Sequence, residues 1–259
     1  MVRSAKSYAS EHLLERERDS WRMRRKDDDD RKTYDEVFNK ENLMRIYKLF
    51  SDGVIDRFDF PISTGKEGNV FRASTANNKL FAVKIFRTSN ASFKDMAKYI
   101  MGDPRFRGLT NNRRKLILAW AAKEFRNLQR LTDFGVRVPK PIAHNKNIIV
   151  MEYIGDETAP APELRDVQLE NPEEIARKIL DYAKLSYQKA GLVHGDLSEF
   201  NVLMFKGEPV IIDVGQAVLL EHPMAKELLE RDVKNIARYF RKLGVKLDVV
   251  QELKEITKK

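Results

Sequence analysis

The first half of the chain alternates short apolar segments with turn signals, which is the pattern of β-strands. Three such segments follow one another between turns that contain glycine or asparagine: 54–62, 69–74 and 80–86. The third is apolar on both faces, so we expect it to be a buried strand. A further apolar segment over 148–154 predicts another buried strand.

Apolar residues at helical spacing predict five helices, one before these strands, one among them and three near the end of the chain. The first is expected after Thr33, which has capping-box spacing to Glu36, and it would end at Gly53. Its apolar face would be formed by Val37, Met44 and residues 47–50. The other four helices are expected over 112–131, 173–190, 224–243 and 247–257.

Two irregular stretches interrupt this pattern. Residues 87–112 are rich in serine, lysine and arginine and predict a surface insert, with room for a short helix. Residues 155–172 carry three prolines with acids between them and are the best candidate for a boundary between lobes. After it, short strands are expected over 202–205 and 210–212. The order of elements therefore predicts an α+β fold with a β-rich first lobe and a mostly helical second lobe. We divide the chain into a charged helical extension, the first lobe and the second lobe: 1–50, 51–154 and 155–259.

Composition narrows the class of protein. Charged residues make up 34% of the 259 residues and hydrophobic residues 42%, as in a soluble globular protein. No apolar run reaches the ~20 residues of a membrane span, and the charged N-terminus has no signal-peptide pattern, so we expect no membrane partner. Cysteine is absent, which suits a cytoplasmic protein. The net charge of +9 favours polyanions such as RNA, or reflects only a basic background, and there is no specific DNA-binding motif.

A glycine-containing segment, residues 63–70, lies between the first two predicted strands. It reads Ser-Thr-Gly-Lys-Glu-Gly-Asn-Val. Two glycines three residues apart let a backbone approach a ligand closely and turn its N–H groups toward phosphate. Taken alone, such glycines more often mark an ordinary hairpin turn. The segment is not a Walker loop, because no Gly-Lys-Ser/Thr opens a helix.

Two charged residues of opposite sign occupy apolar patterns. Lys84 lies in the buried third strand, where an ammonium group must be paired or bind an anion, unless the strand is an edge strand and the lysine reaches solvent. Glu124 lies within the apolar stripe of the 112–131 helix, unless it sits at the margin of that stripe. Together they predict a Lys84–Glu124 ion pair that would hold the lysine toward the phosphates of a nucleotide.

The most informative segment is residues 193–203, which contains His-Gly-Asp-Leu-Ser-Glu-Phe-Asn. A histidine two residues before Asp196, with Asn201 five residues after it, has the spacing of a kinase catalytic loop. Asp213 follows an apolar strand within Ile-Asp-Val-Gly, at the position of an Asp-Phe-Gly motif. Asp196 can accept the proton of a hydroxyl, and the oxygens of Asn201 and Asp213 are ligands that Mg²⁺ prefers. The ordered set of these motifs indicates ATP-dependent phosphoryl transfer.

These motifs resemble the RIO family of atypical serine/threonine kinases. His-Gly-Asp also occurs in aminoglycoside and choline phosphotransferases, so it does not select a family. The glycine loop does select one, because it resembles the loop of type-one RIO kinases, which commonly reads Ser-Thr-Gly-Lys-Glu-Ala-Asn-Val. Gly68 replaces the alanine of that pattern, which we expect to be a minor change. The resemblance covers residues 33–245 and implies a protein-kinase-like fold with a truncated second lobe.

The resemblance also implies roles for individual residues. ATP would lie between the lobes, with Lys84 on its phosphates and Glu124 behind the lysine. Asp196 would be the catalytic base. Asn201 and Asp213 would hold Mg²⁺, with Mn²⁺ as a possible substitute. The loop residues near the phosphates would be Ser63, Gly65, Lys66, Glu67, Gly68, Asn69 and Val70.

Two further features follow from the same comparison. The Glu152 carbonyl and the Ile154 amide would meet the adenine base in a hinge, although residues 151–154 also fit an ordinary core strand. Asp232 either braces the catalytic loop or lies on the surface of its helix. The insert would be a lid or an autophosphorylation segment, or only a surface loop, and its candidate acceptors are Ser89, Ser92 and Thr110.

Several functions stay open at this point. The leading one is a Mg-ATP-dependent serine/threonine kinase that also phosphorylates itself. RIO proteins are linked to maturation of the small ribosomal subunit, so the implied partner is a precursor of that particle, both protein and rRNA. Only 44 residues follow Gly215, without an Ala-Pro-Glu motif, which leaves little room to bind an extended peptide. An ATPase switch with Asp213 as phosphoryl acceptor, a non-catalytic ribosome-binding scaffold and a small-molecule kinase are the alternatives.

Overall fold

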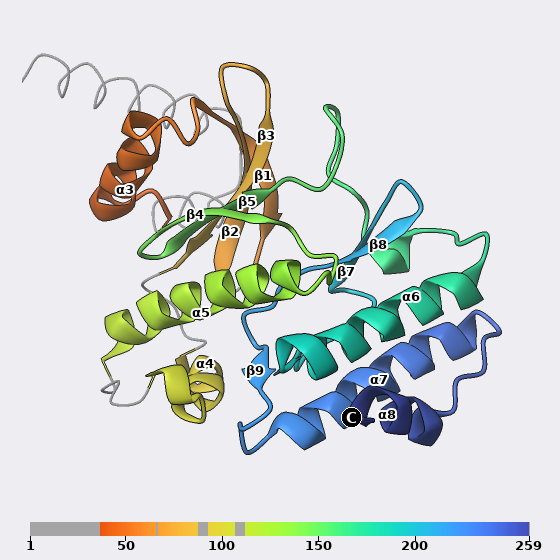
Figure 1. The fold of residues 1–259 in the computed structure, drawn as a ribbon. Helices are drawn as coiled ribbons and strands as arrows, with labels where there is room; N and C mark the ends of the chain where they lie inside the picture. Colours follow the sequence, from red (N-terminus) through yellow and green to blue (C-terminus); the bar gives the residue numbers. More distant parts are fainter. Residues whose placement is uncertain (1–36, 66, 88–92, 107–111, 259) are drawn as a thin grey trace, which may run out of the picture.

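The computed structural model describes residues 37–65, 67–87, 93–106 and 112–258. They form two lobes, a β-sheet with two helices beside it and a second part made mainly of helices (Figure 1). The predicted α+β architecture, with a β-rich first lobe and a mostly helical second lobe, is therefore confirmed. The expected capping box at Thr33 and Glu36, Lys66 of the glycine loop, and Ser89, Ser92 and Thr110 of the insert lie outside the described residues.

The first lobe is built on one antiparallel sheet with the strand order β1-β2-β3-β5-β4. Its strands are β1 (Arg57–Thr64), β2 (Gly68–Ser74), β3 (Leu80–Phe86), β4 (Pro141–Asn145) and β5 (Ile148–Glu152). In the centre of the sheet Lys84 lies opposite Val70 on one side and Ile149 on the other. β3 is thus a central strand, which excludes the edge-strand alternative for its lysine.

Strand β4 was not predicted from the sequence. It starts at a proline and its residues are half-buried or exposed, because it is the edge strand of the sheet. An edge strand that faces solvent lacks the continuous apolar pattern by which the inner strands were predicted. The two-residue strands β6 (Leu192–Val193) and β9 (Val218–Leu219), which pair with one another, are too short to give any such pattern.

Helix α3 (Lys40–Ser51) packs against this sheet. The Asn39 side chain caps its start by accepting from the Asn42 amide, and Ile46 and Leu49 are buried among the residues of the strands. Met44 was expected on the apolar face but is 52% exposed, because the buried face of the helix is formed by Asn42, Ile46 and Leu49. The helix ends just before Gly53, as predicted.

The segment predicted as an insert contains a short helix, α4 (Phe93–Met101), and a 3₁₀ turn, Pro104–Phe106. The long helix α5 (Arg113–Asp133) follows and lies below the sheet, with α4 on its other side (Figure 1). Every residue of its predicted stripe is buried: Ile117, Ala121, Glu124, Leu128 and Leu131. Helix α5 thus separates the sheet from the segments beneath it and presents Glu124 to the interior.

The second lobe stacks three helices below the hairpin of β7 (Val202–Phe205) and β8 (Glu208–Ile211). They are α6 (Pro172–Leu185), which continues as a π-helical turn over Ser186–Ala190, α7 (Ala225–Lys242) and α8 (Val249–Thr257). Gly191 ends the π-helical turn with a left-handed φ of 63°. The buried face of α7 places one carboxylate, Asp232, beneath the loop that precedes β7.

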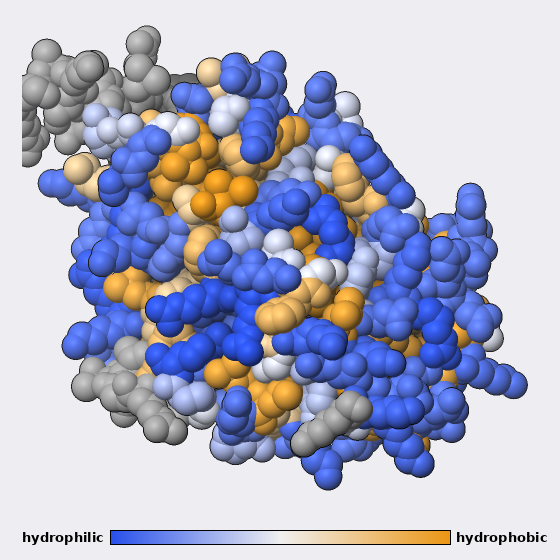
Figure 2. Space-filling view, in the orientation of Figure 1, coloured by the Kyte–Doolittle hydropathy of each residue, from blue (hydrophilic) through white to orange (hydrophobic). Residues whose placement is uncertain are grey.

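The face of the molecule drawn in Figure 2 is mainly hydrophilic, with small hydrophobic patches, one of them near α3 and the neighbouring strands. None of the helices in the described part of the chain is both long and apolar enough to cross a membrane.

Candidate active site

A cleft of about 510 Å³ separates the sheet from the second lobe. This volume lies within the range of roughly 300–1,000 Å³ that small-molecule sites occupy. The cleft brings together most of the predicted site residues: Ser63, Gly65, Glu67, Gly68, Val70, Lys84, Glu124, Glu152, Ile154, Asn201 and Asp213. These residues come from both lobes and from positions up to 150 residues apart in the chain, by the difference 213 − 63.

The glycine loop closes one side of the cleft. The Gly65 amide donates to the Gly68 carbonyl at 2.9 Å, so the turn is closed by its own backbone. A Cβ atom on Gly68 would lie 2.4 Å from the Ile85 carbonyl oxygen of the next strand. The expectation that glycine in place of alanine is a minor change is therefore wrong for this backbone, because an alanine here would force the two strands apart.

Two other residues of the loop have different surroundings. Burial and the nearby Asp213 carboxylate raise the pKa of Glu67 to about 7. Asn69 is fully buried and its Oδ1 accepts from the Arg87 guanidinium at 2.9 and 3.2 Å. Asn69 is not among the residues that line the cleft, so we assign it to the support of the loop instead of to contact with a ligand.

The central feature of the cleft is a charged triad. Lys84 Nζ donates to Glu124 Oε1 at 2.7 Å and Oε2 at 2.9 Å, and to Asp213 Oδ1 at 2.9 Å. Burial lowers the pKa of Lys84, but the Asp213 and Glu124 carboxylates outweigh it, so the pKa is raised and the lysine is charged. Lys84 in turn lowers the pKa of Asp213. The geometry brings the predicted strand–helix ion pair together and adds Asp213 to it.

Asp213 is held in a left-handed backbone conformation, with φ of 58°. Such a conformation costs a non-glycine residue about 1–3 kcal/mol and persists only where the surroundings impose it. The following Gly215 lies against α5, where a Cβ would be 2.9 Å from Glu124 Oε2 and 3.0 Å from Trp120 Nε1. The backbone therefore turns the Asp213 carboxylate out into the cleft, where the side chain is 45% exposed.

Asn201 of the catalytic-loop segment lines the cleft from the second lobe, whereas Asp196 is not among the residues that line it. The Asn201 amide donates to the Asp196 carbonyl at 2.8 Å and to its carboxylate at 3.3 Å. Gln216 Nε2 reaches the same carboxylate at 3.3 Å. Burial raises the pKa of Asp196. A half-buried carboxylate with a raised pKa, fixed by two amides, is suited to accept a proton.

Asp232 lies directly below this loop and is only 2% exposed, which excludes the surface alternative. Its Oδ2 accepts from the Gly195 amide at 2.7 Å and its Oδ1 from the Leu197 amide at 2.8 Å, on either side of Asp196. Arg231 donates to the Gly195 carbonyl. Burial raises the pKa of Asp232 to about 6.

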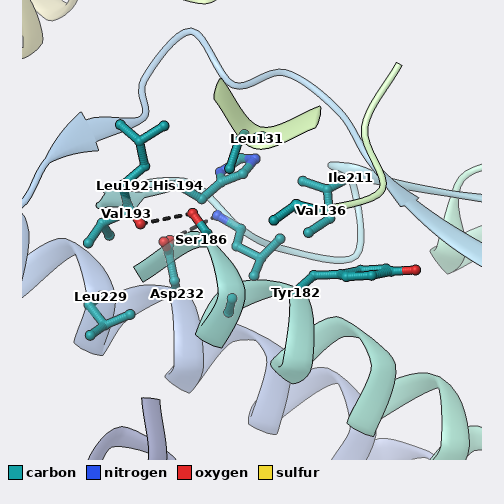
Figure 3. A pocket seen from close by; sticks show the side chains of 12 residues that line it. Leu131, Val136, Tyr182, Ser186, Leu192, Val193, His194, Ile211, Leu229 and Asp232 are labelled. Carbon is teal, nitrogen blue, oxygen red and sulfur yellow. Dashed lines mark hydrogen bonds between the residues drawn. The ribbon is translucent and has the colours of Figure 1, made fainter. Parts of the chain in front are cut away.

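A small cavity lies beside Asp232 (Figure 3). It measures about 20 Å³, and Ser186 at its edge donates to the Leu192 carbonyl at 2.8 Å. This volume is far below that of a ligand site, so we interpret the cavity as an imperfection in the packing that supports the catalytic loop.

The connection between the lobes carries the two residues expected at adenine. Glu152 and Ile154 both line the cleft. The Glu152 side chain points to Arg137, with which it forms two hydrogen bonds of 2.7 and 2.8 Å. The Ile154 carbonyl accepts from the Ala161 amide at 3.0 Å.

Sequence reasoning missed three polar residues near the site: Lys123, Asn127 and Gln216. The first two are fully buried on α5. A signal was present, because Leu116, Trp120, Lys123 and Asn127 repeat the spacing of the predicted stripe one residue earlier along the helix. Beside Glu124, however, a lysine is more simply interpreted as a solvated charge.

The fold and the charged triad together define a class, the enzymes of the protein-kinase type. The family model of the RIO domain matches residues 69–253 of this chain, which is well over half of it. The chain therefore belongs to the RIO family, as its motifs predicted.

Named relatives place it more finely, in the Rio1-type branch. The chain is 45% identical over 234 residues to the RIO-type serine/threonine-protein kinase Rio1 of Haloferax volcanii, covering 90% of this chain and 80% of that one. It is 40% identical over 232 residues to Rio1 of Methanocaldococcus jannaschii, covering 89% and 79%. With the human serine/threonine-protein kinase RIO1 the identity is 41% over 250 residues, which is 95% of this chain but 44% of the human protein.

A solved structure agrees with this fold. The crystal structure of the Rio2 kinase–ADP/Mg²⁺–phosphoaspartate complex from Chaetomium thermophilum is similar with a TM-score of 0.67 and 24% identity, covering 86% of this chain and 68% of that one.

Proposed function

We propose that this protein transfers the γ-phosphoryl group of ATP to serine or threonine hydroxyls, including its own. The observation that supports this most is the triad, in which one buried ammonium joins Glu124 of α5 to Asp213 at the mouth of the second lobe. An ion pair between a strand lysine and a helix glutamate is one requirement of an active protein kinase, and an aspartate placed for the metal is the other. The Lys84–Glu124 pair and Asp213, the proposed metal ligand, lie in the same cleft.

Each residue of the site has a separate role in the transfer. Lys84 stabilises the negative charge of the transferred phosphate, and Glu124 keeps the lysine in place. Asp196 accepts the proton of the acceptor hydroxyl as the hydroxyl oxygen bonds to the γ-phosphorus and the bond to ADP breaks. Asn201 and Asp213 would hold Mg²⁺, or Mn²⁺ in its place, and the bound ion supplies charge neutralisation at the phosphates.

The remainder of the cleft would position the nucleotide. The backbone amides of the described residues of the glycine loop would face the phosphates. The Glu152 carbonyl and the Ile154 amide would meet the adenine edge. The Arg137–Glu152 pair is compatible with this role, because it engages the Glu152 carboxylate and not the backbone carbonyl.

The experiment that tests the proposal is an incubation with γ-labelled ATP and Mg²⁺, without added substrate, which compares the intact protein with Asp196→Ala. We expect acid-stable label on serine or threonine in the intact protein. The variant should lose the transfer by about 100- to 10,000-fold, the range of general-base contributions, yet still bind ATP. Full transfer by the variant would overturn the role of Asp196 as base. Bound ATP with neither label nor free phosphate would favour a scaffold.

A second activity, ATP hydrolysis through Asp213, is favoured by one specific observation. Asp213 Oδ1 is held 2.9 Å from Lys84 while its carboxylate is exposed to the cleft, and the similar Rio2 structure is described as a phosphoaspartate complex. A carboxylate oxygen of Asp213 would bond to the γ-phosphorus as ADP leaves, and water would later release phosphate. Base-labile label with steady release of phosphate would identify this route, and Asp213→Asn should abolish both.

For the biological partner we propose a precursor of the small ribosomal subunit, including its rRNA. The net charge of +9 and the likeness to type-one RIO kinases support this. Binding to purified small-subunit precursors should weaken steeply as salt rises, because contacts to phosphates release counterions. Equal binding at low and high salt would argue against an electrostatic contact with rRNA.

A further inference from the structure

A buried lysine on α5 makes no ion pair with a carboxylate in the described part of the chain. Lys123 is fully buried, and its Nζ donates to the Gly215 carbonyl at 2.7 Å and to the Ala217 carbonyl at 2.5 Å. Both carbonyls belong to the segment that directly follows Asp213. Burying an ammonium group without a carboxylate partner lowers the stability of the fold. We therefore look for a functional role for the contact between Lys123 and the two backbone carbonyls.

Asn127, one turn further along the same helix, binds the same segment. Its Nδ2 donates to the Val214 carbonyl at 2.9 Å and to the Ala217 carbonyl at 3.0 Å. Its Oδ1 accepts from Arg105 Nη1 at 2.9 Å. Two side chains of α5 thus make four hydrogen bonds to three carbonyl groups of this segment, those of Val214, Gly215 and Ala217.

The chain of contacts continues into the insert before α5. Arg105 of the 3₁₀ turn is paired with the buried carboxylate of Asp103, with the shortest contact at 2.6 Å. The Arg105 guanidinium therefore bridges Asp103 and Asn127. The end of the insert, helix α5 and the segment after Asp213 are joined by one buried polar network.

The network lies where it can affect both Lys84 and Asp213. Helix α5 also carries Glu124, which holds Lys84, so one helix fixes both the lysine and the segment that carries Asp213. The left-handed conformation of Asp213 needs its surroundings to impose it. The carbonyls held by Lys123 and Asn127 begin one residue after Asp213, where small shifts would re-aim its carboxylate.

We propose that Lys123 and Asn127 are positioning residues, which clamp the Val214–Ala217 carbonyls to α5 and thereby aim Asp213 at its Mg²⁺. The inference rests on the proposed role of Asp213 as a metal ligand. Residues that orient a metal ligand from behind typically contribute 10- to 100-fold to metal affinity or activity. Loss of the clamp should therefore weaken the metal-dependent part of nucleotide binding and leave the metal-free part unchanged.

Two variants and two matched controls test this. Lys123→Met and Asn127→Leu remove the donors and keep side chains of similar length or volume. Lys115→Met and Gln129→Leu make the same changes at exposed positions of α5. ADP affinity is measured by calorimetry with Mg²⁺ and again with a chelator in its place. Hydrogen exchange of residues 214–219 is measured without nucleotide or metal.

In the two clamp variants we expect the gain in ADP affinity due to Mg²⁺ to fall about tenfold, with unchanged affinity in the chelator. The Mg²⁺ concentration for half-maximal transfer should rise by a similar factor. Exchange over residues 214–219 should accelerate at least tenfold, whereas both controls should match the intact protein. A purely structural role would lower thermal stability and the active fraction without moving the half-maximal Mg²⁺ concentration.

The outcomes separate this inference from the proposed function. If Asp213→Asn abolishes the Mg²⁺-dependent gain while both clamp variants behave as the controls, the clamp is overturned and the metal site stands. If Asp213→Asn itself keeps the full gain, the proposed metal site fails and the clamp fails with it. Should Lys123→Met not fold, Asn127→Leu alone decides, because it leaves the Lys123 bonds and the Arg105–Asp103 pair in place.

Discussion

Lys84 and Lys123 both bury an ammonium group beside helix α5, but they differ in what they bind. Lys84 is 9% exposed and contacts two carboxylates, Glu124 and Asp213. Lys123 is completely buried and contacts two backbone carbonyls. The carboxylates raise the pKa of Lys84 against the effect of burial. Burial, helped by the nearby charge of Arg105, lowers the pKa of Lys123 to about 7.

The difference shows that the partner and not the burial decides the charge of an interior lysine. A paired ammonium stays charged over the physiological range and can serve as a fixed counter-charge for phosphate. Lys123, whose hydrogen bonds go to backbone carbonyls and not to carboxylates, has a pKa near 7, and its N–H groups can hold those carbonyls in place. The first lysine is thus suited to act on a ligand and the second to position a loop.

Among the substitutions that test this comparison, the largest effect should come from Lys84→Met. Transition-state charge on the phosphate would lose its buried counter-charge, and the loss of one such preorganised donor typically costs about 100- to 1,000-fold in kcat. The measurement is the initial rate of transfer from γ-labelled ATP. Lys115→Met, the same change at an exposed position of α5, should keep the rate of the intact protein.

A loss of less than tenfold in Lys84→Met would contradict the comparison, because it would make the two buried lysines equivalent. The rate must be compared with the folded fraction, since Glu124 is left buried without its partner in this variant. Adding Glu124→Gln removes that carboxylate charge. We expect the double variant to recover stability but not activity.

The next effect concerns Asp232, a buried carboxylate that, like Lys123, is satisfied by the backbone. Asp232→Ala leaves the amides of Gly195 and Leu197 without their acceptor, at about 1–3 kcal/mol for each buried group. We expect a decrease of about 2–4 kcal/mol in the free energy of unfolding, measured with urea. Asp181→Ala, at an exposed position of α6, is the matched control and should change it by less than about 0.5 kcal/mol. Equal stability of the two variants would show that the loop does not depend on this acceptor.

A smaller and more selective effect is the pH dependence of stability that Lys123 contributes. Its pKa is about 7 in the folded protein and about 10.4 in an unfolded chain. Between these values the unfolded chain binds a proton that the folded protein lacks, so stability rises with pH, by up to ~1.4 kcal/mol per pH unit. Below pH 7 the full penalty of burying the lysine applies, and above pH 10 it vanishes.

Lys123→Met removes this contribution, so the difference in unfolding free energy between the intact protein and the variant should rise from pH 7 to pH 10. Taking the difference cancels groups common to both proteins. The groups that act on Lys123 from other elements are Arg105, Asp103, Glu67 and His222, and Glu124 acts from its own helix. Parallel stability curves for the two proteins would show that Lys123 has an ordinary pKa.

Sequence reasoning found the first lysine of this comparison and missed the second for a physical reason. Lys84 and Glu124 interrupt apolar patterns, and an interruption can be detected without knowing what lies opposite. The order of the motifs around Asp196, Asn201 and Asp213 then fixed the class of chemistry. The position of Lys123 has meaning only once the segment after Asp213 is known to pack on α5, which no local pattern reveals.

The same limit explains the other differences. The left-handed conformation of Asp213 and the tight approach of Gly68 to the Ile85 carbonyl depend on neighbours distant in the chain. Edge strand β4 was missed because exposure on one face erases the apolar signal. The four later helices were predicted with ends close to those of the structure, because their apolar stripes and glycine caps are local properties. The first helix ends as predicted but begins at Lys40, capped by Asn39, and not after Thr33.

The smallest effect should come from the Arg137–Glu152 pair, which is the half-exposed counterpart of the Lys84–Glu124 pair. Its side chains are 31% and 33% exposed, against 11% and 2% for the buried pair. Partly solvated ion pairs contribute only about 0.2–1 kcal/mol to the free energy of unfolding. Two hydrogen bonds join Arg137 to Glu152, so we expect a contribution at the upper end of this range. Arg137→Met should therefore lower the free energy of unfolding by about 1 kcal/mol in low salt.

The response to salt and the affinity for ATP should distinguish the Arg137–Glu152 pair from the Lys84–Glu124 pair. Added salt should shrink the effect of Arg137→Met, because solvent-exposed charges are screened, whereas the activity loss of Lys84→Met should be insensitive to salt. The affinity for ATP should fall no more than about threefold, since the proposed adenine contact of Glu152 is made by its backbone and not by the carboxylate that Arg137 binds. A tenfold loss of affinity would mean that the pair shapes the hinge itself, and would move Arg137 from a supporting residue to part of the nucleotide site.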